Sequence, residues 1–403
     1  MKKKVLLIIF TVLLLCSCKF EKGEKSISVS ELEQETVQND LEVTETEAET
    51  TEEPVTTALK EQNHSSFGGE ISYHAYSDVV SADDIYDVEM VELPPSINGI
   101  MYYVCGLIDG KIMVCLNKEE TAETFVCEYG LYDYKTDSYE ILIPYITNGF
   151  YLGAYKNCHF FNISENEDSE SLQLYNSDTD EYVTVFNNVN GCSFKSYEIA
   201  ICDGKCYFDV YTSPEKDNSK VYEYDIENNK LSTYAEYAML PKASGNNLWY
   251  VSYNHDTKIC DKLVNKSSGT DFDIQNKNIL TPICFSNRVF AVTNDDISSP
   301  KTSDVLKEIH ADGDDTLILA TWPGEGEIIS NVTTNDFCIG WFDITGNDST
   351  PCVYDVENEK IAVFGDMPKC YYRTYLDDKS GLLFDEMNFS STHQVWVFEP
   401  KEK

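Results

Sequence analysis

Residues that could do chemistry are spread along this chain without forming a recognisable catalytic motif. The six histidines are His64, His74, His159, His255, His310 and His393. No two of them stand four residues apart, the spacing of a zinc-binding helix. The sequence has no Gly-x-Ser-x-Gly elbow, Walker loop or dinucleotide fingerprint. Its 70 Asp and Glu residues are too many for a catalytic pair to be picked out. The sequence leaves enzymatic activity uncertain and leans against it.

Cysteine is the other reactive residue type, and most of the 14 cysteines fall inside predicted strands. Many cysteines in an exported protein normally indicate disulfides, but free cysteine also packs as a small apolar side chain. Strand register decides whether Cys202 can bridge to Cys206, or Cys338 to Cys352. No Cys-x-x-Cys pair exists, so a zinc or thioredoxin-type site is not indicated. We expect mostly free thiols.

The cysteine with the clearest chemistry lies at the amino terminus. Three lysines precede the apolar run Val5–Leu15, which as a helix would be about 16 Å long. That is too short to cross a bilayer and is typical of a cleavable export signal. Residues 15–18, Leu-Cys-Ser-Cys, resemble the lipobox of bacterial lipoproteins. The resemblance implies a signal peptide at 1–17 and a lipid on Cys18. Cys16 fits less well, because bulky Leu15 would take the small-residue position. An ordinary secretory signal is the alternative.

Charge and composition suggest where the chain works. The chain has 28 lysines and only two arginines, Arg288 and Arg373, as in proteins from A/T-rich genomes. The residue after Cys18 is Lys19, not an acidic inner-membrane retention signal. We therefore expect a lipid anchor in a Gram-positive cell membrane, with the protein on its extracytoplasmic face. The net charge of −40 disfavours nucleic acid as a partner and favours cations, basic peptides or neutral glycans.

The segment 18–66 is predicted to be a disordered acidic tether. Between Ser26 and Leu59 it holds ten acidic residues and no basic one, with Thr and Glu dominating. Such a stretch has too little apolar surface to offset chain entropy, and its like charges extend it. A coiled coil, the alternative, would need an apolar heptad that is not present. Residues 67–84 are assigned to a connector.

A repeat runs through residues 85–403, the predicted globular domain. Its mark is a short strand that begins at positions 131, 174, 221, 263, 306, 353 and 395, separated by 43, 47, 42, 43, 47 and 42 residues. Two strands joined by a tight turn precede each mark, as at Asp109-Gly110 and Asp203-Gly204, where Asp-Gly favours a hairpin. After each of the first six marks comes a turn and a fourth strand. Four antiparallel strands every 44 residues or so are typical of a β-propeller blade.

The seventh unit lacks a fourth strand, because the chain ends at Lys403. Residues Tyr86–Leu93 alternate with period two and belong to no other unit. Since an open edge would leave backbone groups unpaired, this strand is predicted to complete the last blade. The fold class is therefore all-β: a seven-bladed β-propeller of four-stranded blades, closed by an amino-terminal strand. The fourth unit is the weakest, because Leu240–Asn246 makes a poor first strand.

One turn carries a family resemblance. The sequence Ile309-His310-Ala311-Asp312-Gly313 resembles the Ile-x-x-Asp-Gly turn between third and fourth strands of TolB-like propellers and of related domains of unknown function. The resemblance implies the architecture and no catalytic residue, because this motif is a structural turn.

Ligands of propellers usually bind on the face formed by the second-to-third-strand loops and the blade-to-blade connections. Loops predicted at Asn117–Glu120, Glu165–Asp168 and 294–296 are acidic, so calcium is the one cofactor they would suit. None has the ordered ligand spacing of a calcium loop, so no metal site is assigned. Tryptophan can stack on a sugar, and of the four (Trp249, Trp322, Trp341 and Trp396) only Trp322 lies in a connection. Trp322 is the candidate ligand-binding residue, and no catalytic residue is named.

These observations favour a lipid-anchored surface module that binds a protein, peptide or glycan without catalysis. The alternatives are a carbohydrate-active lyase or glycosidase on the same scaffold, and an envelope sensor that works with a membrane protein. Fold alone does not decide among them.

Overall fold

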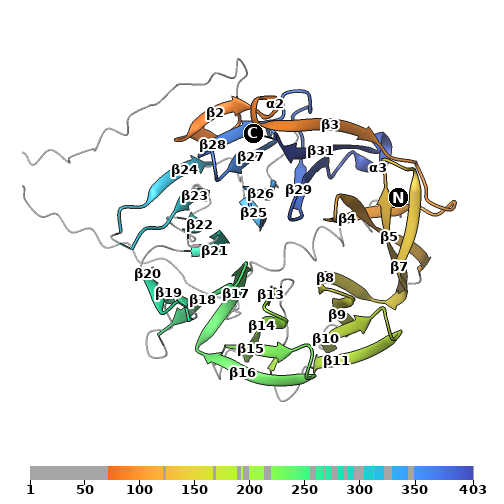
Figure 1. The fold of residues 1–403 in the computed structure, drawn as a ribbon, viewed down its shortest axis with the longest axis horizontal. Coiled ribbons are helices and arrows are strands. Elements are labelled where there is room, and N and C mark those ends of the chain that lie inside the picture. Colours follow the sequence, from red (N-terminus) through yellow and green to blue (C-terminus); the bar gives the residue numbers. More distant parts are fainter. Residues whose placement is uncertain are drawn as a thin grey trace, which may run out of the picture. The chain divides into compact units, whose positions relative to one another are not determined.

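Four-stranded antiparallel sheets follow one another around a ring (Figure 1). In each of these seven blades the first strand lies nearest the middle of the ring and the fourth lies at its rim. The computed structural model describes residues 71–402 except for 121–123, 167–168, 188–191, 194–198, 213–218, 255–259, 267, 275–278, 286–287, 295–303, 312, 322–328 and 344–348. The predicted signal peptide and tether lie outside the described residues. The architecture confirms the predicted seven-bladed propeller.

The strands of the blades follow the chain in order. Blade 1 consists of β4 (Tyr102–Ile108), β5 (Lys111–Glu120), β6 (Phe125–Asp133) and β7 (Ser138–Thr147). Blade 2 consists of β8 (Gly149–Tyr155), β9 (Cys158–Asn166), β10 (Ser169–Asn176) and β11 (Glu181–Asn187). Blade 3 consists of β13 (Ala200–Cys202), β14 (Lys205–Thr212), β15 (Lys220–Asp225) and β16 (Lys230–Glu236), with β12 (Cys192–Ser193) also paired to β14. Blade 4 consists of β17 (Ala238–Ser244), β18 (Asn247–Tyr253), β19 (Cys260–Asn265) and β20 (Thr270–Asp273).

The remaining three blades have the same order. Blade 5 consists of β21 (Ile279–Phe285), β22 (Arg288–Asn294), β23 (Asp304–Glu308) and β24 (Thr316–Ala320). Blade 6 consists of β25 (Ile329–Thr334), β26 (Cys338–Asp343), β27 (Cys352–Asp355) and β28 (Lys360–Val363). Blade 7 consists of β29 (Tyr372–Leu376), β30 (Gly381–Asp385), β31 (Gln394–Pro400) and, from the amino-terminal side, β3 (Tyr86–Glu92). The described helices, α2 (Ala82–Ile85) and α3 (Phe389–Thr392), have four residues each.

Strand β3 closes the ring as predicted. It pairs antiparallel with β31 over its whole length, from Tyr86 opposite Pro400 to Glu92 opposite Gln394. The Tyr86 side chain is buried, and its hydroxyl donates to Asp355 Oδ2 at 2.7 Å, which ties the closing strand to blade 6. Strand β29 of the last blade contacts β4 of the first. The outer edge of β31 is therefore paired, and blade 7 lies against blade 1.

Residues 72–85, most of which were assigned to the connector, add further strands to two blades. Strand β1 (His74–Ala75) pairs antiparallel with β24, and β2 (Asp78–Ser81) pairs parallel with β28. Before β1, the buried Tyr73 hydroxyl lies 3.0 Å from that of Tyr372. The segment 72–92, here called the belt, thus runs along the outer strands of blades 5, 6 and 7.

In several blades the repeated third strand carries a tyrosine that organises the turn after it. In blades 1 to 3 its hydroxyl donates to an Asp or Asn side chain five residues later, at a position with positive φ. These pairs are Tyr132–Asp137 at 2.6 Å, Tyr175–Asp180 at 3.1 Å and Tyr224–Asn229 at 2.9 Å. The predicted Asp109-Gly110 and Asp203-Gly204 turns also have positive φ at both residues. The Ile-x-x-Asp-Gly segment lies between β23 and β24, as the TolB-like resemblance implied, and Gly313 has a φ of +84°.

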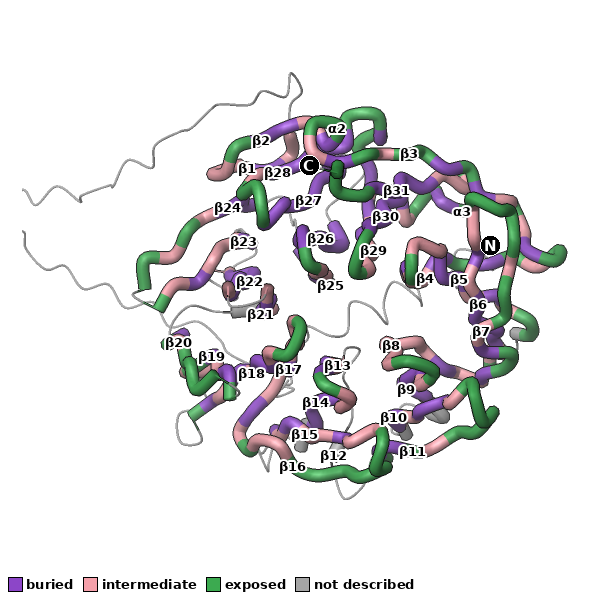
Figure 2. Tube along the Cα trace, in the orientation of Figure 1, coloured by how far each residue is buried: buried purple, intermediate pink, exposed green. Residues whose placement is uncertain are grey.

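The core lies between neighbouring blades, and Figure 2 shows most burial on the second and third strands of the blades. Trp249, Trp341 and Trp396 are all buried in these layers. Trp341 and Trp396, which lie in strands β26 and β31, therefore belong to the core. Burial also removes Trp249 as a sugar-stacking surface.

One loop prediction is wrong, and one weak strand signal has a structural cause. Asn117–Glu120 is predicted to be a loop, but it belongs to β5 and its backbone pairs with β6. The weak signal of the fourth unit reflects a real irregularity. Strand β17 contains a bulge between Met239 and Lys242, and Leu240 has a φ of 52°.

Strand register settles the two cysteine pairs. Cys202 lies opposite Lys205 and Cys206 opposite Ile201, so the two thiols point to opposite faces of the hairpin. Cys338 lies opposite Asp355, at the far end of β27 from Cys352. Neither pair has the geometry of a disulfide. Every cysteine whose side chain the structure describes is a free thiol.

Candidate functional site

The two residues singled out from the sequence, Cys18 and Trp322, lie outside the described residues. The positions on either side of the Trp322 segment are both hydrogen-bonded to Asp304. Asp304 Oδ2 accepts from the backbone N–H of Ile329 at 2.9 Å, and the Asp304 N–H donates to Thr321 Oγ1 at 2.9 Å. Burial raises the pKa of Asp304, against the opposing effect of its hydrogen bonds. Asp304 therefore fixes both ends of this blade-to-blade connection.

The acidic loops considered for calcium are only partly described. Residues 167–168 and 295–296 lie outside the described set, and Asn117–Glu120 is a strand. Within the described ranges, no group of three His, Cys, Asp or Glu residues is placed to hold a metal ion. Nor does any helix in those ranges have the length and apolarity needed to cross a membrane.

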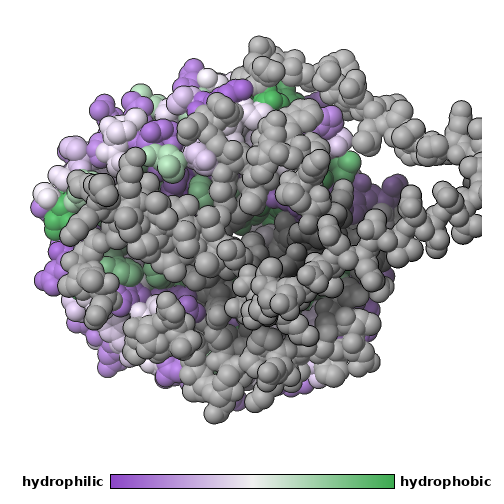
Figure 3. Space-filling view, turned by 180° about the vertical axis from the view of Figure 1, so that it is seen from behind, coloured by the Kyte–Doolittle hydropathy of each residue, from purple (hydrophilic) through white to green (hydrophobic). Residues whose placement is uncertain are grey.

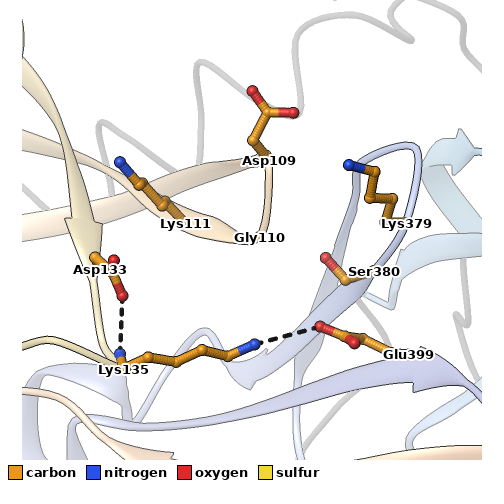
Figure 4. A pocket seen from close by; sticks show the side chains of 8 residues that line it. All are labelled: Asp109, Gly110, Lys111, Asp133, Lys135, Lys379, Ser380 and Glu399. Atoms are coloured by element: carbon orange, nitrogen blue, oxygen red, sulfur yellow. Dashed lines mark hydrogen bonds and ion pairs between the residues drawn. The ribbon is translucent and has the colours of Figure 1, made fainter.

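The side of the ring that carries the turns after first and third strands is here called the turn face. A shallow hollow of about 200 Å³ lies on it where blade 7 meets blade 1 (Figure 4). Its lining consists of Asp109, Gly110, Lys111, Asp133, Lys135, Lys379, Ser380 and Glu399. Lys135 lies 3.6 Å from Glu399, and Lys111 lies 3.5 Å from Glu140 outside the hollow. These ion pairs are solvent-exposed, so they contribute little energy and do not mark this hollow as a strong binding site.

The same corner of the turn face is held together by Asp377. Its Oδ2 accepts from the Gly110 N–H of blade 1 at 2.7 Å, and its backbone carbonyl accepts from Asn335 of blade 6 at 2.8 Å. Its other oxygen accepts from the Ser380 N–H of its own turn at 2.7 Å. Asp377 therefore links three consecutive blades where the ring closes.

A second depression, of about 580 Å³, lies on the turn face between blades 5 and 6 and contains Arg288. Glu308 fills one edge of this guanidinium: Nε donates to Oε1 at 2.7 Å and Nη2 to Oε2 at 2.6 Å. Nη1 donates to the Val356 carbonyl of blade 6 at 3.1 Å, and Nη2 also reaches Glu359 at 3.2 Å. Every nitrogen of Arg288 has a partner, so this arginine ties two blades together.

The other arginine, Arg373, lies on the innermost strand of blade 7. Its backbone pairs with Phe384 of β30 and with Phe342 of β26 in blade 6. Its guanidinium carbon lies 4.3 Å from the centre of the Phe342 ring, in the geometry of a cation–π contact. Tyr375, two residues along the same face, stacks on Phe384 and accepts a hydrogen bond from Arg373 Nη1 at 3.1 Å. Two aromatic rings thus hold the guanidinium in place.

Glu386 faces this guanidinium from the start of the connection that follows β30. Because it lies two residues beyond Phe384, its side chain is on the same face of the sheet as that of Arg373. Its Oε2 lies 3.3 Å from Arg373 Nε, an ion pair without hydrogen-bond geometry. Burial raises the pKa of Glu386, although the positive charge of Arg373 opposes this effect. The carboxylate keeps 30% of its side-chain surface exposed, against 14% for Arg373, so Glu386 is the outer member of the pair.

One edge of the Arg373 guanidinium is left incompletely bonded. Nε and Nη2 are buried and have no hydrogen-bond partner within the described part of the chain. Buried donors of a charged group without acceptors are costly, and such atoms in a folded protein call for an explanation. The Nε–Nη2 edge of an arginine can donate two parallel hydrogen bonds to one carboxylate. In Arg288 this edge binds the carboxylate of Glu308 in that way. Arg373 is therefore equipped to bind a planar anion.

The Arg373 site lies toward the side opposite the turn face, where the sequence predicted ligands to bind. That side is seen in Figure 3, where the visible described side chains around the rim are mostly hydrophilic and the residues outside the described set are grey. Sequence reasoning did not select Arg373 or Glu386. The available signal was scarcity: Arg373 is one of two arginines among 30 basic residues. Its place beside Phe342 and Glu386 depends on inter-blade pairing that one sequence does not reveal.

No protein-family model and no curated protein sequence matches the chain. Several solved propeller structures resemble it. The β-propeller domain of the Trilobed protease from Pyrococcus furiosus is 9% identical, with 76% of this chain and 96% of that chain covered and a TM-score of 0.51. An uncharacterized protein from Listeria monocytogenes EGD-e is 11% identical, with 77% and 96% covered and a TM-score of 0.46. TolB from Acinetobacter baumannii is 11% identical, with 71% and 78% covered and a TM-score of 0.38.

At such identities the similarity concerns the fold alone. The Pyrococcus furiosus domain is described as having an open velcro topology. In the present chain, β3 instead pairs with β31 and closes the last blade. This chain is a seven-bladed β-propeller that its own amino-terminal strand closes.

Proposed function

We propose that this protein is a binding module, held by lipid on Cys18 at the extracytoplasmic face of the cell membrane, and that it recognises its ligand without transforming it. The observation that supports binding most directly is the Nε–Nη2 edge of Arg373, which lies on the innermost strand of blade 7 and has no hydrogen-bond partner among the described residues. The ligand is a protein, peptide or glycan. A propeller presents such a site on a frame of packed strands, which fixes the geometry of the bound group.

The anchor is supported by the amino-terminal sequence. Two acyl chains, each buried CH₂ contributing about 0.8 kcal/mol, would make the attachment stable. The test is a pair of variants expressed in a Gram-positive host. Cys18→Ser should abolish incorporation of labelled fatty acid and remove the protein from the membrane fraction, whereas Cys16→Ser should leave both unchanged. Labelling that persists in Cys18→Ser, or that is lost in Cys16→Ser, would contradict the assignment.

Binding is tested by probing the mature chain with arrays of glycans and peptides, with and without calcium. We expect a defined subset of array members to be retained by the wild-type chain and lost in Arg373→Met. Retention of the same members by Arg373→Met would show that the ligand binds elsewhere.

A carbohydrate-active enzyme is the second candidate, and one observation favours it. Glu386 combines a raised pKa with a partly exposed carboxylate, the properties of a general acid. Incubation of each retained glycan with the protein separates the two candidates. Recovery of the glycan unchanged after prolonged incubation supports binding, and new reducing or unsaturated ends would identify an enzyme.

A further inference from the structure

We infer that the ligand group recognised at Arg373 is a carboxylate, and that it takes the place that Glu386 partly occupies beside the guanidinium. This inference rests on the proposed binding function and specifies the chemistry of its site. The Nε–Nη2 edge of the guanidinium is bonded differently in the two arginines. In Arg288 both donors of that edge reach a carboxylate, at 2.7 and 2.6 Å. In Arg373 one donor lies 3.3 Å from Glu386 without a hydrogen bond, and the other has no partner among the described residues.

The surroundings of Arg373 favour a planar anion. The Phe342 ring covers one side of the guanidinium, and Tyr375 accepts from Nη1. These contacts fix the plane of the guanidinium, and its Nε–Nη2 edge is left without hydrogen bonds to any described residue. A carboxylate matches that edge with two parallel hydrogen bonds, and the partly dry surroundings strengthen the attraction between the charges.

Glu386 determines how the ligand enters. The two donor atoms themselves are buried, and the exposed member of the pair is Glu386. A ligand carboxylate therefore reaches Arg373 only as the Glu386 side chain turns toward solvent. In this exchange the ion pair of Arg373 with Glu386, which lacks hydrogen-bond geometry, is replaced by two hydrogen bonds to the ligand carboxylate. The net charge of the buried site does not change. Met387, next along the chain, is 46% exposed and offers apolar contact to the rest of the ligand.

A carboxylate of this kind could belong to an acidic sugar or to an amino acid. The probes are therefore two matched pairs: glucuronate with glucose, and N-acetylalanine with N-acetylalaninamide. Each is titrated into the purified mature chain, tether and anchor included, up to about 10 mM, which detects dissociation constants in the millimolar range. We expect at least one acid to bind and its neutral twin not to bind.

The variants assign the binding to the site. Arg373→Met keeps the aliphatic packing against Phe342 and removes the guanidinium donors, so the affinity for the acid should fall at least about tenfold. Arg373→Lys keeps the positive charge without the planar guanidinium, so its affinity for the acid should lie between that of the wild type and that of Arg373→Met. Arg288→Met is the matched control and should leave the affinity unchanged. A thermal unfolding curve for each variant shows that it is folded.

Three outcomes would overturn the inference. They are equal binding of an acid and its neutral twin, unchanged binding of the acid in Arg373→Met, and no binding of either acid at the highest concentration. If the array ligands of the proposed function are still retained in the last case, the binding function stands and only the carboxylate assignment fails.

Discussion

Arg288 and Arg373 lie at neighbouring blade junctions and put the same side chain to different uses. At the junction of blades 5 and 6, Arg288 has its carboxylate edge filled by Glu308 and its remaining nitrogen on the Val356 carbonyl. At the junction of blades 6 and 7, Arg373 lies against the Phe342 ring, and its Nε and Nη2 have no hydrogen-bond partner within the described ranges. A guanidinium whose donors are all hydrogen-bonded adds to stability, because its removal leaves the partner groups buried without their hydrogen bonds. One with unbonded donors costs stability, and a ligand that bonds them recovers that cost.

Removal of Arg288 should have the largest effect on stability. Arg288→Met leaves Glu308, whose side chain is only 12% exposed, without its bidentate partner. Breaking a buried ion pair costs about 3–5 kcal/mol, and partial exposure of Arg288 reduces this to about 2–3 kcal/mol of unfolding free energy. Chemical denaturation measures the change. A loss below about 0.5 kcal/mol would mean that the pair contributes no more than a surface salt bridge.

Removal of Arg373 should cost much less stability. Arg373→Met loses one hydrogen bond to Tyr375, a cation–π contact and the 3.3 Å ion pair with Glu386, but it removes two buried donor atoms that have no hydrogen-bond partner among the described residues. We expect a change within about 1 kcal/mol in the same denaturation experiment. A loss equal to that of Arg288→Met would place Arg373 among the structural ties, and the contrast between the two arginines would fail.

Substitution of the two glutamates should separate an effect on binding from an effect on stability. Glu386→Gln removes the charge that competes for Arg373 and should tighten carboxylate binding about three- to tenfold, with little loss of stability. Glu308→Gln, the matched control, should destabilise the fold and leave binding unchanged. Weaker binding in Glu386→Gln would show that this carboxylate contacts the ligand instead of giving way to it.

The smallest effect is a dependence on pH. The groups facing Glu386 are Arg373 and Tyr375 on β29 and its neighbour Asp385, with Cys105 on β4 beyond Tyr375. Since burial raises the pKa of Glu386, the competitor loses its charge at a higher pH than an ordinary glutamate does. Carboxylate affinity should therefore rise as the pH is lowered toward 5, and Glu386→Gln should not show this rise.

Stability should change in the same direction. The folded chain takes up the Glu386 proton at a higher pH than the unfolded chain does. This group therefore adds to the unfolding free energy as the pH falls through its folded pKa, and that contribution is lost as the pH rises. Denaturation of wild type and Glu386→Gln at a series of pH values isolates the difference. A difference with the opposite sign would mean that the fold favours the charged carboxylate.

How far the sequence predicts this molecule depends on how local each signal is. The blades follow from turns and alternation that recur in every unit, and β3 could be assigned because it was a strand without a blade. The belt strands β1 and β2 were missed because two and four residues are too short to show a period. The site was missed for a different reason. Arg373, Phe342 and Glu386 come together only through pairing between blades 6 and 7 and the register of β29 on β30.

The presence of only two arginines allows a direct test of the contrast between them. Labelling the mature chain with ¹⁵N-arginine gives two side-chain Nε–H signals in a nuclear magnetic resonance spectrum, and Arg373→Met and Arg288→Met assign them. The signal of Arg288 should exchange slowly with water and stay fixed when the carboxylate probe is added. The signal of Arg373 should shift on titration and, once the probe is bound, exchange as slowly as that of Arg288. A shift of the Arg288 signal on addition of the probe would contradict the account. Two signals that both stay unchanged on titration would contradict it as well.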